Sequence, residues 1–261
     1  MTDAGLLARH LAAIAIAQEA GDLARRHFLD RDAMAITFKG PQDWLTQADR
    51  QVEDLVTGRV RAAFPGDACV GEETGGTEAG SVWVIDPIDG TSNFARAVPH
   101  FCISIGYMRD RKIETGVIYN PITGEMFTGR RGHGAFCNGR AMKVSRTDDF
   151  MRATIELGWS TRRSIADYTQ LMTRVVGAGA SFRRAGSGAL GMAYVADGRN
   201  DGYAELHINV WDVLAGIVMV TEAGGWTNDF LTGDGFAKGN AILAGAPGIR
   251  AVLTETTGIA A

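Results

Sequence analysis

Two carboxylates three residues apart, Asp86 and Asp89, begin the segment of this chain best suited to chemistry. The segment reads Asp-Pro-Ile-Asp-Gly-Thr-Ser-Asn-Phe and directly follows the apolar run of residues 82–85. Like charges held close need a cation or a proton between them, and paired carboxylates can hold a hard cation. The next pair, Gly90 and Thr91, is typical of a helix start, where free backbone N–H groups bind anions. The segment therefore indicates a metal ion and a phosphate side by side, as in a metal-dependent phosphatase.

Three further acidic residues lie where predicted elements begin or end, which is where a rigid scaffold presents functional groups. Asp49 falls in the first turn of one predicted helix, Asp212 at the start of another, and Glu72 just after a glycine turn. Taken alone, Asp49 is more readily explained as a helix cap. Asp212 fits a charge that answers the helix dipole equally well. Glu72 and Glu73 by themselves indicate a solvated loop pair.

The bulk composition is that of a globular protein of 261 residues, 46% hydrophobic and 21% charged, with a net charge of −4. This charge, without a basic run, argues against nucleic acid as a main partner. The start of the chain fits neither a signal peptide nor a membrane span, so we expect a cytoplasmic protein with no membrane partner. The three cysteines form no Cys-x-x-Cys pair, and neither a zinc-hydrolase motif nor a nucleotide-triphosphatase loop occurs.

The first half of the chain is predicted to combine two helices with a sheet. Helical spacing of apolar residues predicts helices over residues 5–28 and 45–64, and Thr46 with Asp49 matches a capping box. Short β-type runs separated by turn residues then cover residues 82–85, 101–108, 113–119, 125–128 and 134–137. This pattern indicates a largely antiparallel sheet.

The second half alternates short strands with helices, which favours an α/β arrangement. The predicted strands are residues 153–157, 202–205 and 241–244, and the predicted helices are residues 167–176, 189–196 and 213–223. We therefore expect two intimately packed halves, residues 1–146 and residues 147–261, with the active site between them. The first half would carry most metal ligands, and the second would carry Asp212 and the substrate pocket.

Taken together, these motifs resemble the inositol monophosphatase family, a group of magnesium-dependent, lithium-sensitive phosphatases. The resemblance rests on Gly-Glu-Glu from Gly71, the nine-residue segment from Asp86, and Trp-Asp-Val-Leu-Ala-Gly from Trp211. Lys39 and residues 43–49 support it. The motifs follow the family's order over nearly the whole chain. The resemblance implies a layered α/β/α/β/α sandwich of the sugar-phosphatase type.

The resemblance also implies a site for two to three Mg²⁺ ions, built from carboxylates and one backbone carbonyl. The ligands of the first ion would be Glu72, Asp86 and the carbonyl of Ile88. Those of the second would be Asp86, Asp89 and Asp212. A weaker third ion near Glu72 would keep mostly water ligands, as Mg²⁺ prefers.

The same resemblance assigns catalytic roles to Asp49, Thr91 and Glu72. Asp49 and Thr91 would orient and deprotonate a metal-bound water, which attacks phosphorus in line. The metals would offset the charge that develops on the leaving oxygen. Backbone N–H groups of Gly90 and Thr91 would grip the phosphate. No covalent intermediate is required.

The alcohol half of the substrate is less closely specified. Glu205 matches the family's acidic residue that accepts hydrogen bonds from polyol hydroxyls, although the same carboxylate would suit the amine of histidinol phosphate. Gly186, Ser187 and Gly188 match a small-residue stretch that lines the pocket. A strand-to-helix turn that needs glycine explains this stretch equally well.

We therefore expect a phosphoric monoester hydrolase that acts on inositol monophosphate or a related small phosphorylated polyol. Histidinol-phosphate, bisphosphonucleotide and sugar-bisphosphate phosphatases share the framework and remain alternatives. The pair Arg183-Arg184 would suit a second phosphate, although exposed structural arginines are more common. A regulatory binding protein that retains the fold is a further alternative. The resemblance also implies a homodimer and inhibition by millimolar lithium, with tolerance arising in the loop around Lys39.

Overall fold

The computed structural model of the chain describes residues 2–30, 36–40 and 43–260. The helices are α1 (Asp3–Leu29), α2 (Gln47–Ala63), α3 (Thr91–Ala95), α4 (Ile165–Gly177), α5 (Gly188–Ala196), α6 (Val210–Glu222), α7 (Gly235–Lys238) and α8 (Arg250–Thr257), with 3₁₀ turns at Phe150–Arg152 and Pro247–Ile249. The strands are β1 (Ile36–Gly40), β2 (Asp43–Thr46), β3 (Ala68–Gly71), β4 (Ser81–Asp89), β5 (Cys102–Arg109), β6 (Lys112–Asn120), β7 (Glu125–Arg130), β8 (Gly134–Cys137), β9 (Arg140–Ala141), β10 (Thr154–Leu157), β11 (Ser181–Arg183), β12 (Gly202–Ile208), β13 (Trp226–Thr227) and β14 (Asn240–Gly245).

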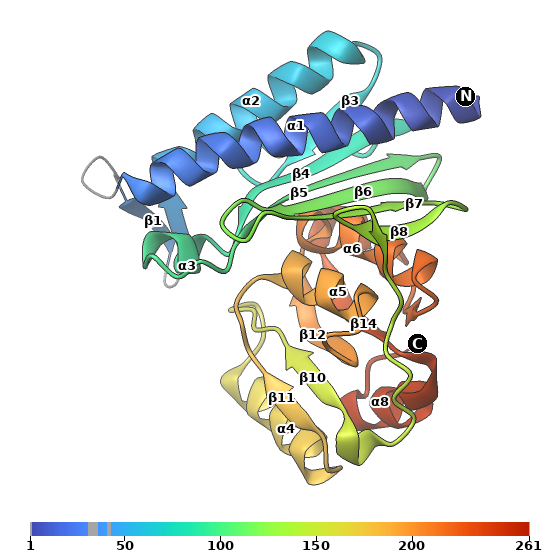
Figure 1. Cartoon of the computed structure of the whole chain (residues 1–261). Helices are drawn as coiled ribbons and strands as arrows, with labels where there is room; N and C mark the ends of the chain where they lie inside the picture. The colour runs from blue at the N-terminus through green and yellow to red at the C-terminus, as the bar shows by residue number, and fades with distance from the viewer. Residues whose placement is uncertain (1, 31–35, 41–42, 261) are drawn as a thin grey trace.

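Five layers stack on one another in the molecule (Figure 1). Helices α1 and α2 cover one face of a seven-stranded sheet, and α5 and α6 cover its other face. A five-stranded sheet follows, and α4 and α8 cover its outer face. This arrangement confirms the predicted α/β/α/β/α sandwich.

The seven-stranded sheet has the strand order β3-β4-β5-β6-β7-β8-β9. Strand β3 pairs with β4 in parallel, and the other neighbours pair antiparallel, as the turn-separated runs predict. Successive side chains point to opposite faces of the sheet. On β4, Trp83 and Ile85 therefore pack toward α1 and α2, while Val82 and Val84 pack toward α5 and α6.

Helix α1 lies flat on the first sheet because one of its faces is made of small residues. Its start is capped by Thr2, whose side chain accepts a hydrogen bond from the Gly5 N–H at 3.3 Å. The fully buried stripe consists of Ala13, Ala17, Ala20 and Ala24. This helical spacing places all four alanines on one face, where the backbone approaches the sheet closely. Among the described helices, none combines the length and the apolar character of a membrane span.

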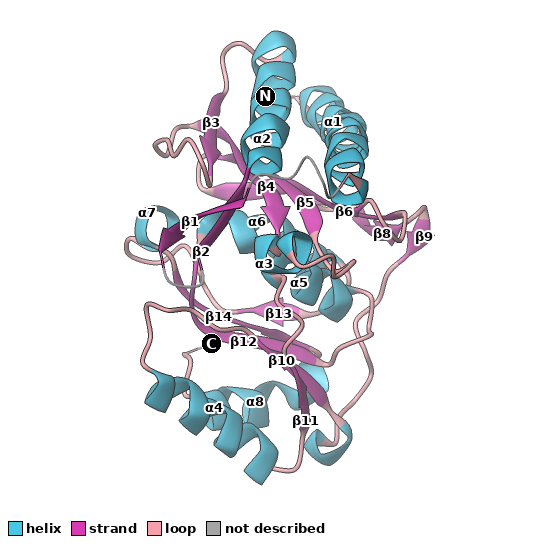
Figure 2. Cartoon of the chain, turned by 90° about the vertical axis from the view of Figure 1, so that its left-hand side faces the viewer, coloured by secondary structure: helices cyan, strands magenta, loops and turns pink. Residues whose placement is uncertain are grey.

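The five-stranded sheet has the order β11-β10-β12-β14-β13 and mixes parallel with antiparallel pairs. Helices α4 and α8 lie together beneath it (Figure 2). Ile155 and Leu157 of β10 share a buried cluster with Leu171 of α4 and Leu253 of α8. The second half is thus the α/β unit that the alternating pattern predicts.

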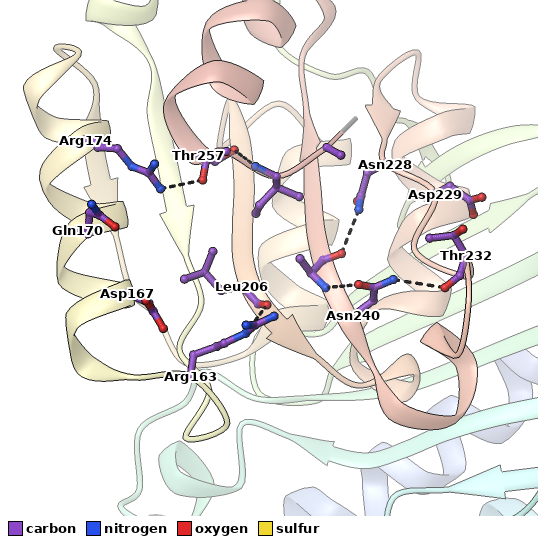
Figure 3. Close-up of a pocket in the computed structure, with 14 residues that line it drawn as sticks. Arg163, Asp167, Gln170, Arg174, Leu206, Asn228, Asp229, Thr232, Asn240 and Thr257 are labelled. Carbon is purple, nitrogen blue, oxygen red and sulfur yellow. Dashed lines mark hydrogen bonds between the residues drawn. The ribbon is translucent and has the colours of Figure 1, made fainter.

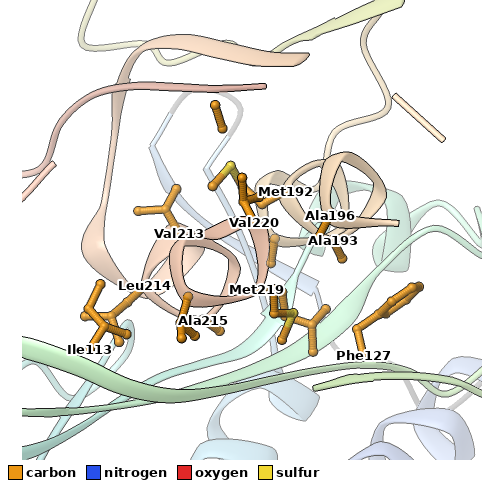
Figure 4. Close-up of a cluster of buried hydrophobic side chains, with 14 of the residues drawn as sticks. Ile113, Phe127, Met192, Ala193, Ala196, Val213, Leu214, Ala215, Met219 and Val220 are labelled. Atoms are coloured by element: carbon orange, nitrogen blue, oxygen red, sulfur yellow. The ribbon is translucent and has the colours of Figure 1, made fainter. Parts of the chain in front are cut away.

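Helices α5 and α6 fill the space between the sheets, and their side chains form one core with both (Figure 4). A row of glycines lets α6 approach the first sheet, because Gly106, Gly116 and Gly129 are paired neighbours on β5, β6 and β7. A Cβ atom at Gly116 would lie 2.6 Å from the Cα of Ala215. One at Gly129 would lie 2.9 Å from the Cγ of Met219. Larger residues in this row would push α6 away from the sheet.

Two predictions from the sequence concern the start of the second helix and the division of the chain into halves. The second helix begins at Gln47, not at residue 45, because the chain up to Thr46 forms β2 and pairs with β1. The lithium loop and the capping box depend on the side chains of Lys39 and Thr46, which lie outside the part of the chain whose side chains are described. The two main sheets comprise residues 68–141 and 154–245, so the division at residue 146 falls between them. The division into halves stays a prediction.

Candidate active site

Strand β4 delivers two aspartates to its end. The apolar residues 82–85 anchor the strand, since each is 1% exposed or less. The pairing of β4 with β5 then shifts register between Asp86 and Asp89, which are themselves only 1% and 6% exposed. The Ile88 N–H donates a hydrogen bond to Asp86 Oδ1 at 3.0 Å. The strand thus ends in two buried carboxylates.

Asp212 reaches the same point from α6, in the other half of the chain. The N–H of Asn209, the N-cap residue of α6, donates to Asp212 Oδ2 at 3.0 Å. Asp212 therefore also stabilises the start of α6, as expected for a negative charge at the N-terminus of a helix. Oxygen atoms of Asp86, Asp89 and Asp212 all lie within 4.8 Å of one another. The structure brings these three predicted ligands together.

The N-terminus of α5 holds the Asp89 carboxylate. Ser187 is the N-cap residue of α5, and its hydroxyl donates to Asp89 Oδ2 at 2.5 Å. The N–H groups of Ala189 and Gly188 donate to the same carboxylate at 2.7 and 3.3 Å. Ser187 and Gly188 therefore contact a predicted metal ligand, and their predicted contact with substrate stays a prediction.

Glu72 lies just after β3, which runs parallel to β4. Its loop is fixed by Glu53 of α2, a buried residue that no sequence motif singles out. The Glu53 carboxylate accepts hydrogen bonds from the N–H groups of Glu73 and Thr74, both at 2.9 Å. A signal was available, because Glu53 stands four residues after Asp49 and so shares its helix face.

Thr91 lies between Asp49 and the backbone carbonyl of Ile88. Its hydroxyl oxygen is 3.0 Å from the Ile88 oxygen and 3.3 Å from Asp49 Oδ1. Asp49 is completely buried on α2. Helix α3 begins at Thr91, after Gly90, whose φ of 99° lies in the left-handed region that favours glycine. The predicted catalytic pair and the predicted phosphate-binding backbone thus meet at one turn.

We call Glu72, Asp86, Asp89 and Asp212 the carboxylate floor. Burial raises the pKa of Asp86 well above its ordinary value, and the neighbouring carboxylates of the floor raise it further. Burial likewise raises the pKa of Asp89 and that of Asp212. Within the described residues, no lysine or arginine forms an ion pair with any of these three aspartates. Clustered oxygen donors without a protein cation are what a divalent ion requires, so the floor fits Mg²⁺.

Glu205 of β12 lies beside the floor, in a cavity of about 190 Å³ that Asp89 and Asp212 also line. Burial raises the pKa of Glu205 to about 8, and a hydrogen bond from Tyr203 opposes the shift. The Tyr203 hydroxyl donates to Glu205 Oε2 at 2.7 Å. Gly186, whose role in substrate binding is predicted, lines the same cavity.

A second buried carboxylate, Glu156 of β10, was not predicted. Burial raises its pKa to about 7, against hydrogen bonds from the Ala185 N–H and the Asn200 side chain. The Asn200 bond measures 2.8 Å. The Ala185 carbonyl accepts a hydrogen bond from the Asn93 amide of α3 at 2.9 Å. Glu156 and Asn93 therefore fix the loop that leads into α5.

A larger cavity, of about 850 Å³, adjoins the floor and is lined by Glu72, Thr91 and Asp212. Three aromatic residues and two arginines also line it. Four of these five residues, which we call the mouth, are Trp159, Arg162, Tyr168 and Arg184; the fifth is Trp211 of α6. The cavity thus joins an acidic floor to a basic and aromatic mouth.

The layered fold and its acidic centre belong to a family of phosphatases. The family described as "Inositol monophosphatase family" matches residues 8–257. The chain therefore belongs to the inositol monophosphatase family, as its motifs predict.

Named relatives and a solved structure support this membership over most of the chain. Nus factor SuhB of Escherichia coli strain K12 is 35% identical over 240 residues, 90% of each chain. The inositol-1-monophosphatase of Rhizobium meliloti strain 1021 is 36% identical over 242 residues, 91% of each chain. The crystal structure of extragenic suppressor protein suhB from Bartonella henselae has a TM-score of 0.89 and 36% identity, covering 96% of this chain and 98% of that one. At nearly equal similarity, the relatives carry two kinds of name.

Proposed function

We propose that the protein is a Mg²⁺-dependent phosphomonoesterase that hydrolyses inositol monophosphate or a related small phosphorylated polyol. The observation that carries this proposal is the convergence of Asp86, Asp89 and Asp212, whose oxygens lie within 4.8 Å of one another. Three carboxylates so close together, two of them buried and the third half-buried, are costly without a cation. A divalent ion explains their proximity better than a structural role does.

Two or three Mg²⁺ ions would be held by the carboxylate floor and the backbone carbonyl of Ile88. When bound, they would lower the pKa of water and offset charge on the leaving oxygen. Strand β4 supplies Asp86 and Asp89, and α6 supplies Asp212. Placement on rigid elements, each supported by backbone hydrogen bonds, keeps such ligands in register with the substrate.

The proton path that we propose runs through Thr91 to Asp49. Because the two side chains are 3.3 Å apart, Asp49 Oδ1 can accept the proton of the Thr91 hydroxyl. The Thr91 oxygen can then accept a proton from the attacking water. Glu72 lines the same cavity as Thr91, and we assign it to this catalytic group. The N–H groups of Gly90 and Thr91 would bind the phosphate oxygens.

Glu205 supports a polyol as the alcohol part of the substrate. Its carboxylate accepts the Tyr203 hydroxyl and retains lone pairs for further hydroxyl donors. Gly186, Ser187 and Gly188 line the same cavity and leave room for a ring. The amine of histidinol phosphate would also suit a carboxylate, so the two substrate classes must be compared directly.

Phosphate release by metal-stripped protein tests the proposal. The panel is inositol phosphate, histidinol phosphate, fructose bisphosphate and adenosine bisphosphate, each with and without Mg²⁺. We expect release only with Mg²⁺, a higher kcat/KM for polyol phosphates than for histidinol phosphate, and inhibition by millimolar lithium. No release from any compound, with Mg²⁺ binding intact, would contradict the proposal. A preference for histidinol phosphate would make Glu205 the partner of a cation.

A regulatory function is the second candidate, because relatives named Nus factor SuhB are as similar to the chain as a relative named for phosphatase activity. We propose catalysis as the main function, since a purely regulatory protein has no need of a complete carboxylate floor. We also propose a cytoplasmic homodimer. Light scattering of the purified protein tests the dimer, and a monomer at all concentrations would contradict it.

A further inference from the structure

We infer that Glu156 is a positioning residue, which holds Asp89 in the geometry that binds a metal ion. The inference rests on the proposed phosphatase function and adds to it a residue outside the metal-binding motifs. Glu156 is 2% exposed and lies on β10 of the five-stranded sheet, whereas Asp89 ends β4 of the seven-stranded sheet. The two are connected through residues 184–187, which we call the α5 loop because they lead into α5.

One residue of the α5 loop, Ala185, is held from two sides. Its N–H donates a hydrogen bond to the Glu156 carboxylate. Its carbonyl accepts a hydrogen bond from the Asn93 amide of α3 at 2.9 Å, and the same amide donates to the His100 carbonyl at 2.8 Å. The Ala185 backbone therefore links the second sheet to the helix that begins at Thr91.

The residues that follow Ala185 hold the metal ligand. Ser187 comes two residues later, and its hydroxyl donates to Asp89 Oδ2 at 2.5 Å. The Ala189 N–H donates to the same oxygen at 2.7 Å. Hydrogen bonds weaken steeply when their distance and angle change. A displaced Ala185 would therefore alter the position of the Asp89 carboxylate.

Glu156 is itself fixed on several sides. The amide of Asn200, a residue that is 1% exposed, donates to Glu156 Oε2 at 2.8 Å and accepts a hydrogen bond from Arg183 Nη1 at 3.3 Å. A Cβ atom at Gly191 would lie 3.2 Å from Glu156 Cδ, so the carboxylate also packs against the first turn of α5. Two donors, the Asn200 amide and the Ala185 N–H, thus face one carboxylate. A carboxylate has two acceptor oxygens for them, whereas a glutamine amide has one.

Packing of the sheet does not explain a carboxylate at this position. Side chains alternate along β10, so Ile155 and Leu157 enter the buried cluster beneath α4 and α8, while Glu156 points toward α5. Burial raises the pKa of Glu156 to about 7, which means that burying its charge costs free energy. An apolar side chain would avoid this cost. What the carboxylate adds is its hold on the α5 loop.

Two other polar side chains fix backbone segments away from the floor and serve as controls. Glu222 accepts hydrogen bonds from two N–H groups of the turn at residues 132–134, both at 2.8 Å. It ends α6 ten residues after Asp212, which corresponds to about 15 Å along the helix. The Asn228 side chain bonds two backbone groups of β14 at 2.8 and 3.0 Å. Asn228 lines a separate cavity of about 580 Å³, and none of the described residues around that cavity belongs to the floor (Figure 3).

Calorimetric titration of Mg²⁺ into metal-stripped variants tests the inference. We expect Glu156→Gln to lower Mg²⁺ affinity by about 10–100-fold, as the loss of groups that orient metal ligands does. Asn200→Ala loosens the carboxylate without removing it, so it should lower the affinity by a smaller factor. Glu222→Gln and Asn228→Ala should lose stability in urea but keep Mg²⁺ affinity within about twofold.

A double variant separates positioning from a general loss of stability. In Glu156→Gln/Asn200→Asp the donor and acceptor roles are exchanged: the new amide can donate to the new carboxylate, and its oxygen remains for the Ala185 N–H. We expect this double variant to recover most of the Mg²⁺ affinity that Glu156→Gln loses.

The results that would overturn the inference differ from those that would overturn the proposed function. Wild-type Mg²⁺ affinity in Glu156→Gln and Asn200→Ala, an equal loss in the two controls, or a double variant no tighter than Glu156→Gln would remove the positioning role. The phosphatase function would then still stand. A wild-type protein that releases no phosphate from any substrate of the panel would overturn the proposed function, and the inference with it.

Discussion

The carboxylate floor and the mouth are built in opposite ways. On the floor, Asp89 is 6% exposed and accepts three hydrogen bonds from the start of α5. At the mouth, Arg162 and Arg184 are exposed, and Arg162 is attached to α6 through one asparagine. The scaffold therefore fixes the groups proposed to do chemistry and leaves recognition of the rest of the substrate to surface side chains. Such side chains can change without disturbing the core.

Removing one charge from the floor should have the largest effect. Asp89→Asn keeps the shape of the side chain but removes the carboxylate that would hold a second Mg²⁺. We therefore expect kcat to fall by at least about 1,000-fold, measured as phosphate release at saturating Mg²⁺. Asp54→Asn, at an exposed position of α2, is the control. Near-normal turnover by Asp89→Asn would refute the two-metal assignment.

The second largest effect should come from displacing α6, the helix that carries Asp212. Gly116→Ala places a Cβ atom 2.6 Å from the Cα of Ala215, so α6 must move and carry Asp212 with it. We expect the free energy of unfolding to fall by about 3 kcal/mol, as for overpacked cores, with weaker Mg²⁺ binding. Gly58→Ala is the matched control, because nothing lies within 4 Å of its Cβ position in α2, and it should stabilise the protein slightly. Urea unfolding measures the stability of both variants. Equal free energies of unfolding for Gly116→Ala and Gly58→Ala would refute the close packing of α6 on the sheet.

Removing the support of one floor residue should have a smaller effect. Ser187→Ala deletes the hydroxyl 2.5 Å from Asp89, and we expect Mg²⁺ affinity to fall by about 10–100-fold. Ser164→Ala deletes an equivalent cap at the start of α4, which supports no metal ligand. Both variants should lose about 1 kcal/mol of stability, but only the first should lose Mg²⁺ affinity. Equal affinities in calorimetric titrations would reduce Ser187 to an ordinary helix cap.

The smallest effect should come from Glu205, which lines the proposed alcohol pocket, and it should be a pH-dependent change in Tm. Burial raises the folded-state pKa of Glu205 from 4.5 to about 8, so the penalty for burying its charge is absent below about pH 4.5 and complete above about pH 8. Glu205→Gln removes this penalty. In metal-free buffer we expect equal Tm values near pH ~4.5 and a gain of at least about 3 °C near pH ~8.5. The control Glu255→Gln, at an exposed position, should show no such trend in Tm. A Tm difference for Glu205→Gln that is the same at both pH values would contradict the burial argument.

Much of the candidate site could be predicted because its main motif is local. Asp86, Asp89 and Thr91 lie in one short segment, so a single strand and turn position them together. A local pattern was also enough to predict strand β8, because turn residues bound residues 134–137. Apolar spacing predicts a helix that includes residues 45–46, whereas pairing with β1 decides their structure. Local patterns therefore predict elements well until a distant strand competes for the same residues.

Contacts through space could not be predicted in the same way. The hydrogen bond between Ser187 and Asp89 connects the start of α5 with the end of β4, and no local spacing encodes it. The mouth is similar. The sequence presents Arg183 and Arg184 as one pair, but only Arg184 lines the cavity, whereas Arg183 donates a hydrogen bond to Asn200. Arg162 joins the mouth through a turn whose path only the fold determines.

The central claim is that the carboxylate floor is a divalent metal centre. Calorimetric titration of Mg²⁺ into metal-stripped wild-type protein tests it most directly, with Asp89→Asn titrated in parallel. We predict at least two Mg²⁺ ions per wild-type chain and the loss of at least one in the variant. A wild-type protein that binds no Mg²⁺ at millimolar concentration would contradict the claim.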